Sequence, residues 1–294
     1  MTRAEIETTV EPIIRECLRR FGEYSPPDIS VEEFARATAG ELRPDVRRIS
    51  LLISLTQSVA GFALEGEGLE LGCGCGYLIF PLALFYPKVR WTGVDHPERN
   101  FFNRSDFQQI FRAYNCQLVG VNFVHEPLPF ADHHFSVITF SETLEHLPVE
   151  RLSFVLSEIR RVLRPGGLFI VSSPNQASLE NRIRLFKGRS ILDLPEPLAR
   201  AECIFGHIRL YTPTEVILMM SQRGFSLERS VLESNNSAYR GSSKKSMRRR
   251  LYRLYERLEQ RLKFLRRLGD TWYMVFRRNS GELDLIVSKP RHKD

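Results

Sequence analysis

The sequence predicts an α/β protein built around a doubly wound parallel sheet. From residue 67 onwards, short apolar runs alternate with longer amphipathic runs, and this alternation is typical of βαβ units. The first predicted strand runs directly into a glycine-rich turn at 72–76, and the second ends in a carboxylate, Asp95. A doubly wound sheet places both features at the carboxyl ends of its strands, where such folds bind ligands.

We expect the first 64 residues to form a helical cap. Apolar residues recur at helical spacing over 6–21, Ser30 can begin a second helix, and Pro44 can open a third. The acidic start of the chain lacks the basic and apolar layout of a signal peptide, and no apolar run approaches the roughly 20 residues of a membrane-spanning helix. These features predict a cytoplasmic protein, with a peripheral membrane contact as one option.

The core is expected over 65–233, and the last strand and C-terminal tail over 270–294. Strands are predicted at 68–71, 89–94, 118–124, 135–140, 168–173, 225–232 and 271–277. Helices are predicted at 76–86, 98–114, 149–163 and 213–223. Thr212, Pro213 and Glu215 suit the start of the last helix as a capping box with proline at its first position. The stretch 174–210 looks irregular.

The positive charge of the chain is concentrated in one segment. The net charge is +7, but residues 240–269 carry twelve Lys or Arg and two acids, which leaves −3 for the rest. We expect a basic helical insertion over 234–269, with an amphipathic helix at 246–268. It could be a surface helix packed on the core, or contact an anionic membrane surface or lipid-linked substrate. Nucleic acid is the weaker alternative, because aromatic residues are sparse and no nucleic-acid module is visible.

The glycine turn indicates a nucleoside cofactor. Glycines allow a sharp turn and a close approach of backbone to ligand. A dinucleotide site would need a sixth-position glycine where Tyr77 stands, and the chain contains no P-loop pattern. Asp95 follows Gly76 by nineteen residues, and a carboxylate there can accept both hydroxyls of a ribose. Taken singly, the turn could be only a turn, and Asp95 could cap the next helix.

The stretch Glu70–Gly76 resembles the first motif of class I S-adenosylmethionine (SAM)-dependent methyltransferases. The likeness continues in Leu128–Phe135, Ser141–Leu147 and Leu163–Gly167, and it spans about 67–230. This resemblance implies SAM as the cofactor and a Rossmann-like sheet of seven strands whose last strand is antiparallel.

By that resemblance, Gly72 and Gly74 pass beneath the amino-acid part of SAM, Glu70 helps to fix that part, and Asp95 holds the ribose. The family usually has Asp and a small residue before the Leu-Pro-Phe segment, but this chain has Val124–Pro127. Glu126 or a backbone amide is therefore expected to contact the adenine. The full set of expected cofactor-binding residues is Glu70, Gly72, Cys73, Gly74, Asp95, Glu126 and Ser141.

The expected chemistry lies just past the fourth strand. Glu142, Glu145 and His146 have the spacing i, i+3, i+4, which predicts one face of a helical turn, and His207 precedes the next helix. These four residues could hold a divalent cation such as Mg²⁺, an arrangement similar to the metal sites of small-RNA 2′-O-methyltransferases and ubiquinone-pathway O-methyltransferases. Without a metal, His146 or His207 would be the general base and Glu142 would serve the helix N-terminus.

These observations predict an enzyme that methylates a hydroxyl of a saccharide, lipid-linked or polyphenol-type molecule, free or attached to a carrier. Its expected catalytic residues are Glu142, His146 and His207. A hydroxyl is a weak nucleophile that needs a base or a metal. No Asp/Asn-Pro-Pro-Tyr motif follows the fourth strand, which disfavours amino-group methylation of nucleobases. The alternatives are an RNA 2′-O-methyltransferase and a non-catalytic SAM-binding protein.

Overall fold

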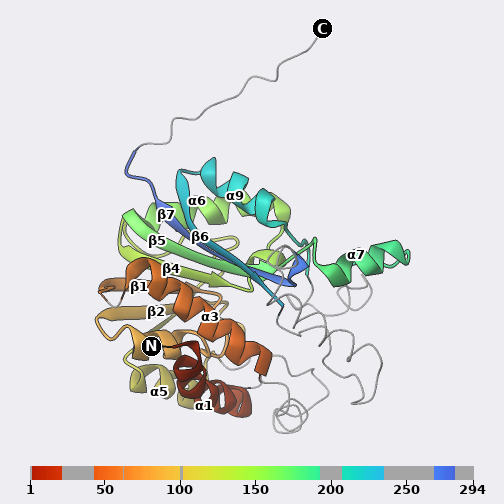
Figure 1. Ribbon diagram of the computed structural model, residues 1–294. Helices are drawn as coiled ribbons and strands as arrows, with labels where there is room; N and C mark the ends of the chain where they lie inside the picture. Colours follow the sequence, from red (N-terminus) through yellow and green to blue (C-terminus); the bar gives the residue numbers. More distant parts are fainter. Residues whose placement is uncertain are drawn as a thin grey trace.

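The computed structural model describes residues 2–21, 43–61, 63–99, 102–192, 207–234 and 268–281. These residues build one mixed sheet with helices on both faces (Figure 1). The strands are β1 (Gly66–Leu71), β2 (Val89–Asp95), β3 (Gln117–Gly120), β4 (Phe135–Ser141), β5 (Leu163–Pro174), β6 (Phe225–Glu233) and β7 (Thr271–Arg278). Their order is β3-β2-β1-β4-β5-β7-β6, and only β7 runs antiparallel to its neighbours. The predicted seven-stranded sheet with an antiparallel last strand is confirmed.

The helices cover both faces of the sheet. They are α1 (Arg3–Phe21), α3 (Arg43–Ala60), α4 (Ile79–Phe85), α5 (Ser105–Ala113), α6 (Leu152–Val162), α7 (Leu179–Phe186) and α9 (Pro213–Ser221), with short 3-10 helices at Leu144–His146 and Val149–Arg151. Side chains alternate along β7, so that Tyr273 and Val275 pack with α1, α3, α4 and α5, whereas Met274 and Phe276 pack with α6 and α9. Two apolar cores, one on each face, therefore bury the sheet.

The N-terminal cap is helical as predicted, where the structure describes it. Helices α1 and α3 pack together through residues such as Ile6, Val10 and Leu52. The Arg3 guanidinium contacts the Glu233 carboxylate at 2.7 Å, and Arg47 contacts the same carboxylate at 3.1 Å. These ion pairs fasten the cap to the end of β6.

Three elements differ from the predictions. Strand β3 ends at Gly120 and not at residue 124, because the chain turns there and the Glu126 N–H donates to the Asn122 carbonyl. Helix α5 begins at Ser105 and not at 98, after turns in which the Arg99 N–H donates to His96. The supposedly irregular stretch after 174 contains α7, which Ser178 caps by accepting the Asn181 N–H at 3.2 Å.

Other predictions hold or lie outside the described residues. The capping box of α9 is present, with Thr212 and Glu215 bonded in both directions. The predicted helix at Ser30 lies outside the described residues, and so does the basic helix at 246–268 apart from Leu268. Among the described helices, none is long and apolar enough to cross a membrane.

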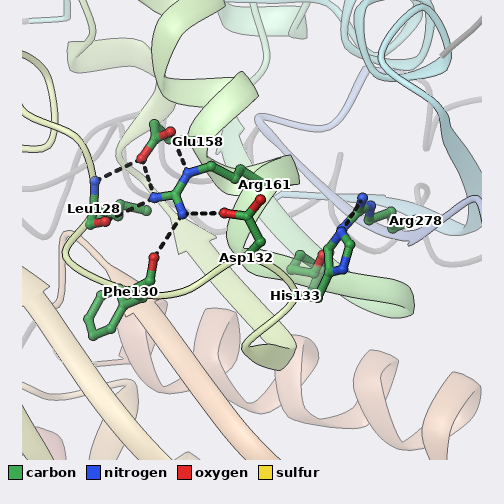
Figure 2. A network of polar contacts seen from close by, with 8 residues as sticks. Leu128, Phe130, Asp132, His133, Glu158, Arg161 and Arg278 are labelled. Carbon is green, nitrogen blue, oxygen red and sulfur yellow. Dashed lines mark hydrogen bonds and ion pairs between the residues drawn. The ribbon is translucent and has the colours of Figure 1, made fainter. Parts of the chain in front are cut away.

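The loop that enters β4 is held by one arginine of α6 (Figure 2). Arg161 uses all five of its N–H donors: two to Glu158, two to the carbonyls of Leu128 and Phe130, and one to Asp132, at 2.7–2.9 Å. The same contacts hold the pKa of Glu158 below its ordinary 4.5. Because β4 starts here, the loop lies at the opposite edge of the sheet from the glycine turn. The segment Leu128–Phe135, part of the resemblance to methyltransferases, therefore stabilises the fold.

We predict that Arg161→Met lowers the free energy of unfolding by about 2 kcal/mol, because the partly buried carbonyls of Leu128 and Phe130 lose their donors. Urea denaturation measures this change, with Arg164→Met at an exposed neighbouring position as the control. The pKa of Glu158 is lower in the folded protein than in the unfolded chain, so its ion pair with Arg161 stabilises the fold at pH values above the unfolded pKa. The difference in stability between wild type and Arg161→Met should therefore shrink as the pH falls through the folded pKa. Equal stability of the two variants at pH 7 would contradict this role.

Candidate active site

The glycine turn follows β1 at the carboxyl edge of the sheet, the edge at which the parallel strands end. The N–H groups of Gly72 and Cys73 donate to the Val94 carbonyl at 2.8 and 3.1 Å. Gly72 and Gly74 have φ values of 73° and 49°, in the left-handed region that favours glycine. A Cβ on Gly72 would lie only 2.7 Å from the Thr143 hydroxyl. The glycines therefore permit both the turn and its contact with the segment after β4.

Asp95 orders this turn from the end of β2. Its Oδ2 accepts the Gly74 N–H at 2.8 Å, and its Oδ1 accepts the His96 N–H at 2.7 Å and the Arg99 Nε–H at 3.3 Å. The residue is 4% exposed. A carboxylate has about four acceptor positions, so these three contacts leave about one for a ligand hydroxyl. The carboxylate thus suits a ribose and also shapes the turn.

The other residues predicted to bind the cofactor lie at or near the same edge. Glu70 is buried near the end of β1, and Ser141 ends β4. The Cys73 side chain is buried and packs against β2, since a Cβ on Gly93 would lie 2.9 Å from its sulfur. Glu126 is exposed in the turn after β3. Because the parallel strands end at this edge, Glu70, Cys73 and Ser141 lie at it, as do the glycine turn and Asp95.

Glu142 does not share a helical turn with Glu145 and His146, so this part of the prediction is wrong. Its φ of 50° turns the chain before the short 3-10 helix at 144–146 begins. Its side chain accepts a hydrogen bond from the Ser172 hydroxyl at 2.9 Å. Because Ser172 gives its only proton to Glu142, the Ser141 hydroxyl donates to Ser172, at 2.8 Å. Glu142 is therefore tied to β5.

Glu145, His146 and His207 form a cluster beside this turn. One potential ligand atom of each lies within 4.8 Å of the others, and the two imidazole centroids are 5.2 Å apart. The N–H groups of Ile208 and Arg209 both donate to the Glu145 carbonyl, at 2.8 and 3.2 Å. This backbone contact brings His207 to the turn from a distant part of the sequence. Three of the four residues predicted to bind a metal are thus together.

Glu145 is the acid of the cluster and is almost fully buried, with 1% of its surface exposed. Burial, and then the negative charge of Glu142, raise its pKa well above 4.5. The two imidazoles are partly exposed and are therefore more accessible than Glu145 to the proton of a ligand.

Arg48 of α3 is a site residue that the sequence analysis missed. Its guanidinium lies 3.6 Å from Glu142, and its Cζ is 5.7 Å from the centre of the Tyr77 ring. It also contacts Asp45 at 3.5 Å, and the residue is 9% exposed. The available signal was a cation next to Ile49 on the buried face of an amphipathic helix. Arg48 connects the N-terminal cap to the glycine turn and to Glu142.

Comparisons with known proteins agree with this geometry. Residues 69–167 match the family described as methyltransferase domain. A ubiquinone/menaquinone biosynthesis C-methyltransferase of Desulfotalea psychrophila is 33% identical over 37% of this chain and 41% of its own length. A ubiquinone biosynthesis O-methyltransferase of Rhizobium leguminosarum bv. trifolii is 29% identical over 44% of this chain and 49% of its own. The match thus spans under half the length of either relative.

The fold is shared with solved structures. A proposed sarcosine dimethylglycine methyltransferase from Galdieria sulphuraria superimposes with a TM-score of 0.53 at 17% identity, over 94% of this chain and 98% of that one. The fold is therefore that of Rossmann-like methyltransferases. Within it, residues 69–167 match a methyltransferase domain and resemble the class I SAM-dependent methyltransferases. This match implies SAM as the cofactor, which the left-handed glycines and the remaining acceptor position of Asp95 fit.

We predict that Asp95→Ala weakens SAM binding about 10- to 100-fold, because a charged hydrogen-bond acceptor and the anchor of the turn are both lost. Isothermal calorimetry measures the dissociation constant, and circular dichroism checks the fold. Glu98→Ala is the matched control, because the Glu98 side chain is 87% exposed. Unchanged affinity in Asp95→Ala would contradict the assignment.

Proposed function

We propose that the protein transfers the methyl group of SAM to a hydroxyl oxygen of a small or carrier-linked acceptor, in the class of saccharides, lipid-linked molecules or polyphenols. The observation that carries the proposal is the position of His146 and His207. They lie beside the turn at 142–146, in which Thr143 packs against Gly72 of the glycine turn. Two imidazoles are therefore next to the place where the methyl group is delivered.

The chemistry of the cofactor determines which steps the protein has to perform. SAM supplies a methyl group that is already activated on a sulfonium. The chain has to position the acceptor and remove the proton of its hydroxyl, and imidazole is the commonest group for that task. Since the Glu145 side chain is buried and the two imidazoles are partly exposed, we assign the base to His146 or His207 and not to Glu145.

The acceptor class draws support from the relatives. Both relatives described above are named for ubiquinone biosynthesis, one as a C-methyltransferase and one as an O-methyltransferase. Those names favour an acceptor that is lipid-linked and aromatic. Adjacent imidazoles favour oxygen over carbon here, because a hydroxyl must lose its proton to become a good nucleophile.

As the alternative to a free histidine base, we propose that Glu145, His146 and His207 hold a divalent cation, with Glu145 ionised as a ligand. One carboxylate and two imidazoles leave coordination positions open, as catalytic metal sites do. Potential ligand atoms of the three residues lie within 4.8 Å of one another, so one cation can be shared among them after a side-chain adjustment. A bound cation would lower the pKa of a coordinated hydroxyl. Glu142 is not part of this proposed set, because Ser172 and Arg48 engage it.

We predict that replacing the base, in His146→Ala or His207→Ala, reduces methyl transfer by at least about 100-fold and leaves SAM affinity within about 2-fold. Transfer from methyl-labelled SAM to a panel of hydroxylated, lipid-linked and RNA acceptors measures the effect. His134→Ala, an exposed histidine at the opposite edge, is the control. If both site variants keep full activity, neither imidazole is the base. If the wild type binds SAM but methylates no acceptor in the panel, the non-catalytic alternative is favoured.

The metal proposal has its own test. Dialysis against EDTA should reduce activity at least about 10-fold, and added Mg²⁺, Mn²⁺ or Zn²⁺ should restore it, because the cation activates the hydroxyl. Glu145→Gln should weaken metal binding without abolishing SAM binding. Activity that survives both EDTA and Glu145→Ala would overturn the metal proposal and leave the histidine base in place.

A further inference from the structure

We propose that the α7 tip, defined as residues 182–190 at the outer end of α7 and the turn after it, docks on an anionic lipid surface. The helix projects from the body of the protein (Figure 1). Its tip exposes apolar side chains to an unusual degree: Ile183 is 44% exposed, Leu185 57% and Phe186 92%. Transfer of this exposed Phe186 side chain from water to an apolar environment would be favourable.

The arrangement around the helix is that of an interfacial segment. With 3.6 residues per turn, Leu179, Ile183 and Phe186 form one stripe, and Arg182 and Lys187 flank it on either side. Long basic side chains beside an apolar stripe can reach the headgroups while the stripe enters the acyl boundary. Leu185 lies on the other side of the helix. Insertion into a bilayer covers both sides, whereas a flat protein partner would cover only one.

The charge of the tip specifies the kind of surface. Residues 182–190 contain Arg182, Arg184, Lys187 and Arg189 and no acid. Within the described part of the chain, none of these four cations makes an ion pair, although Arg182 and Arg184 donate to backbone carbonyls. Unpaired cations beside exposed apolar groups match anionic lipids, which attract each Lys or Arg by about 1 kcal/mol.

The base of α7 is anchored at the candidate active site. Helix α7 begins five residues after Pro174, the last residue of β5, which also carries Ser172, the partner of Glu142. Between them, the Asn175 amide donates to the Gly269 carbonyl at 2.8 Å, and the Gln176 N–H donates to the Tyr211 carbonyl at 3.2 Å. A lipid surface at the tip would therefore lie on the side of the molecule where the strands end. Delivery of a lipid-linked acceptor to the site rests on the proposed function; the docking itself does not.

Flotation of the full chain with lipid vesicles tests the proposal. Wild type should float with vesicles of phosphatidylcholine and phosphatidylglycerol and much less with phosphatidylcholine alone. Phe186→Ser should weaken this binding about 10-fold, and Arg182→Gln with Lys187→Gln should weaken it further and reduce its salt dependence. Leu218→Ser on α9 is the matched control, because Leu218 is as exposed as Leu185, at 57%, and should float like wild type.

Three outcomes would overturn the docking proposal. The first is that wild type does not bind anionic vesicles. The second is that Phe186→Ser floats as well as wild type, in which case the basic segment 246–268 would better explain the binding. A Phe186→Ser variant that changes only the oligomeric state in light scattering would assign the tip to a second copy of the chain, also against the proposal. Calorimetry with SAM verifies that each variant is folded. Failure of methyl transfer with intact flotation would count against the proposed function alone.

Discussion

The buried hydrogen bond from the Gly74 N–H to Asp95 is 2.8 Å long and joins the ends of β1 and β2. It therefore sets the geometry of the glycine turn and of the segments that pack on it. It holds the turn in the left-handed conformation that glycine permits. The absence of a side chain at Gly72 leaves room for Thr143, so that the segment after β4 packs directly on the glycine turn. Three strand ends, distant in sequence, thereby become one surface.

A second set of contacts balances charge at that surface. Glu142 and Glu145 lie close enough for one charge to raise the pKa of the other, and one buried cation, Arg48, contacts Glu142. The Arg48 cation offsets part of the repulsion between these two neighbouring acids. Because Arg48 comes from α3, the helical cap contributes to the electrostatics of the site as well as to the core.

Much of this architecture could be predicted from the sequence, because strand–helix alternation and the glycine turn are local patterns. The positions of Asp95 and Ser141 at strand ends follow from them, whereas the number of strands and the antiparallel last strand were implied by the family resemblance. The errors have physical causes. The left-handed conformation of Glu142 breaks a spacing that suits a helix, and the position of Arg48 beside Ile49 on an amphipathic helix does not show which acid it contacts. Helix α7 was missed because it is short and its apolar stripe is exposed and does not pack against the core.

The central claim is that SAM binds across the strand ends joined by Gly74 and Asp95. Hydrogen exchange of backbone amides with and without SAM tests it most directly. The account predicts slower exchange on SAM addition at 72–77, 95–99 and 142–146, and no change in the Arg161-held loop at 128–135 on the opposite edge. Unchanged exchange at 72–77 under saturating SAM, or protection confined to 128–135, would contradict it.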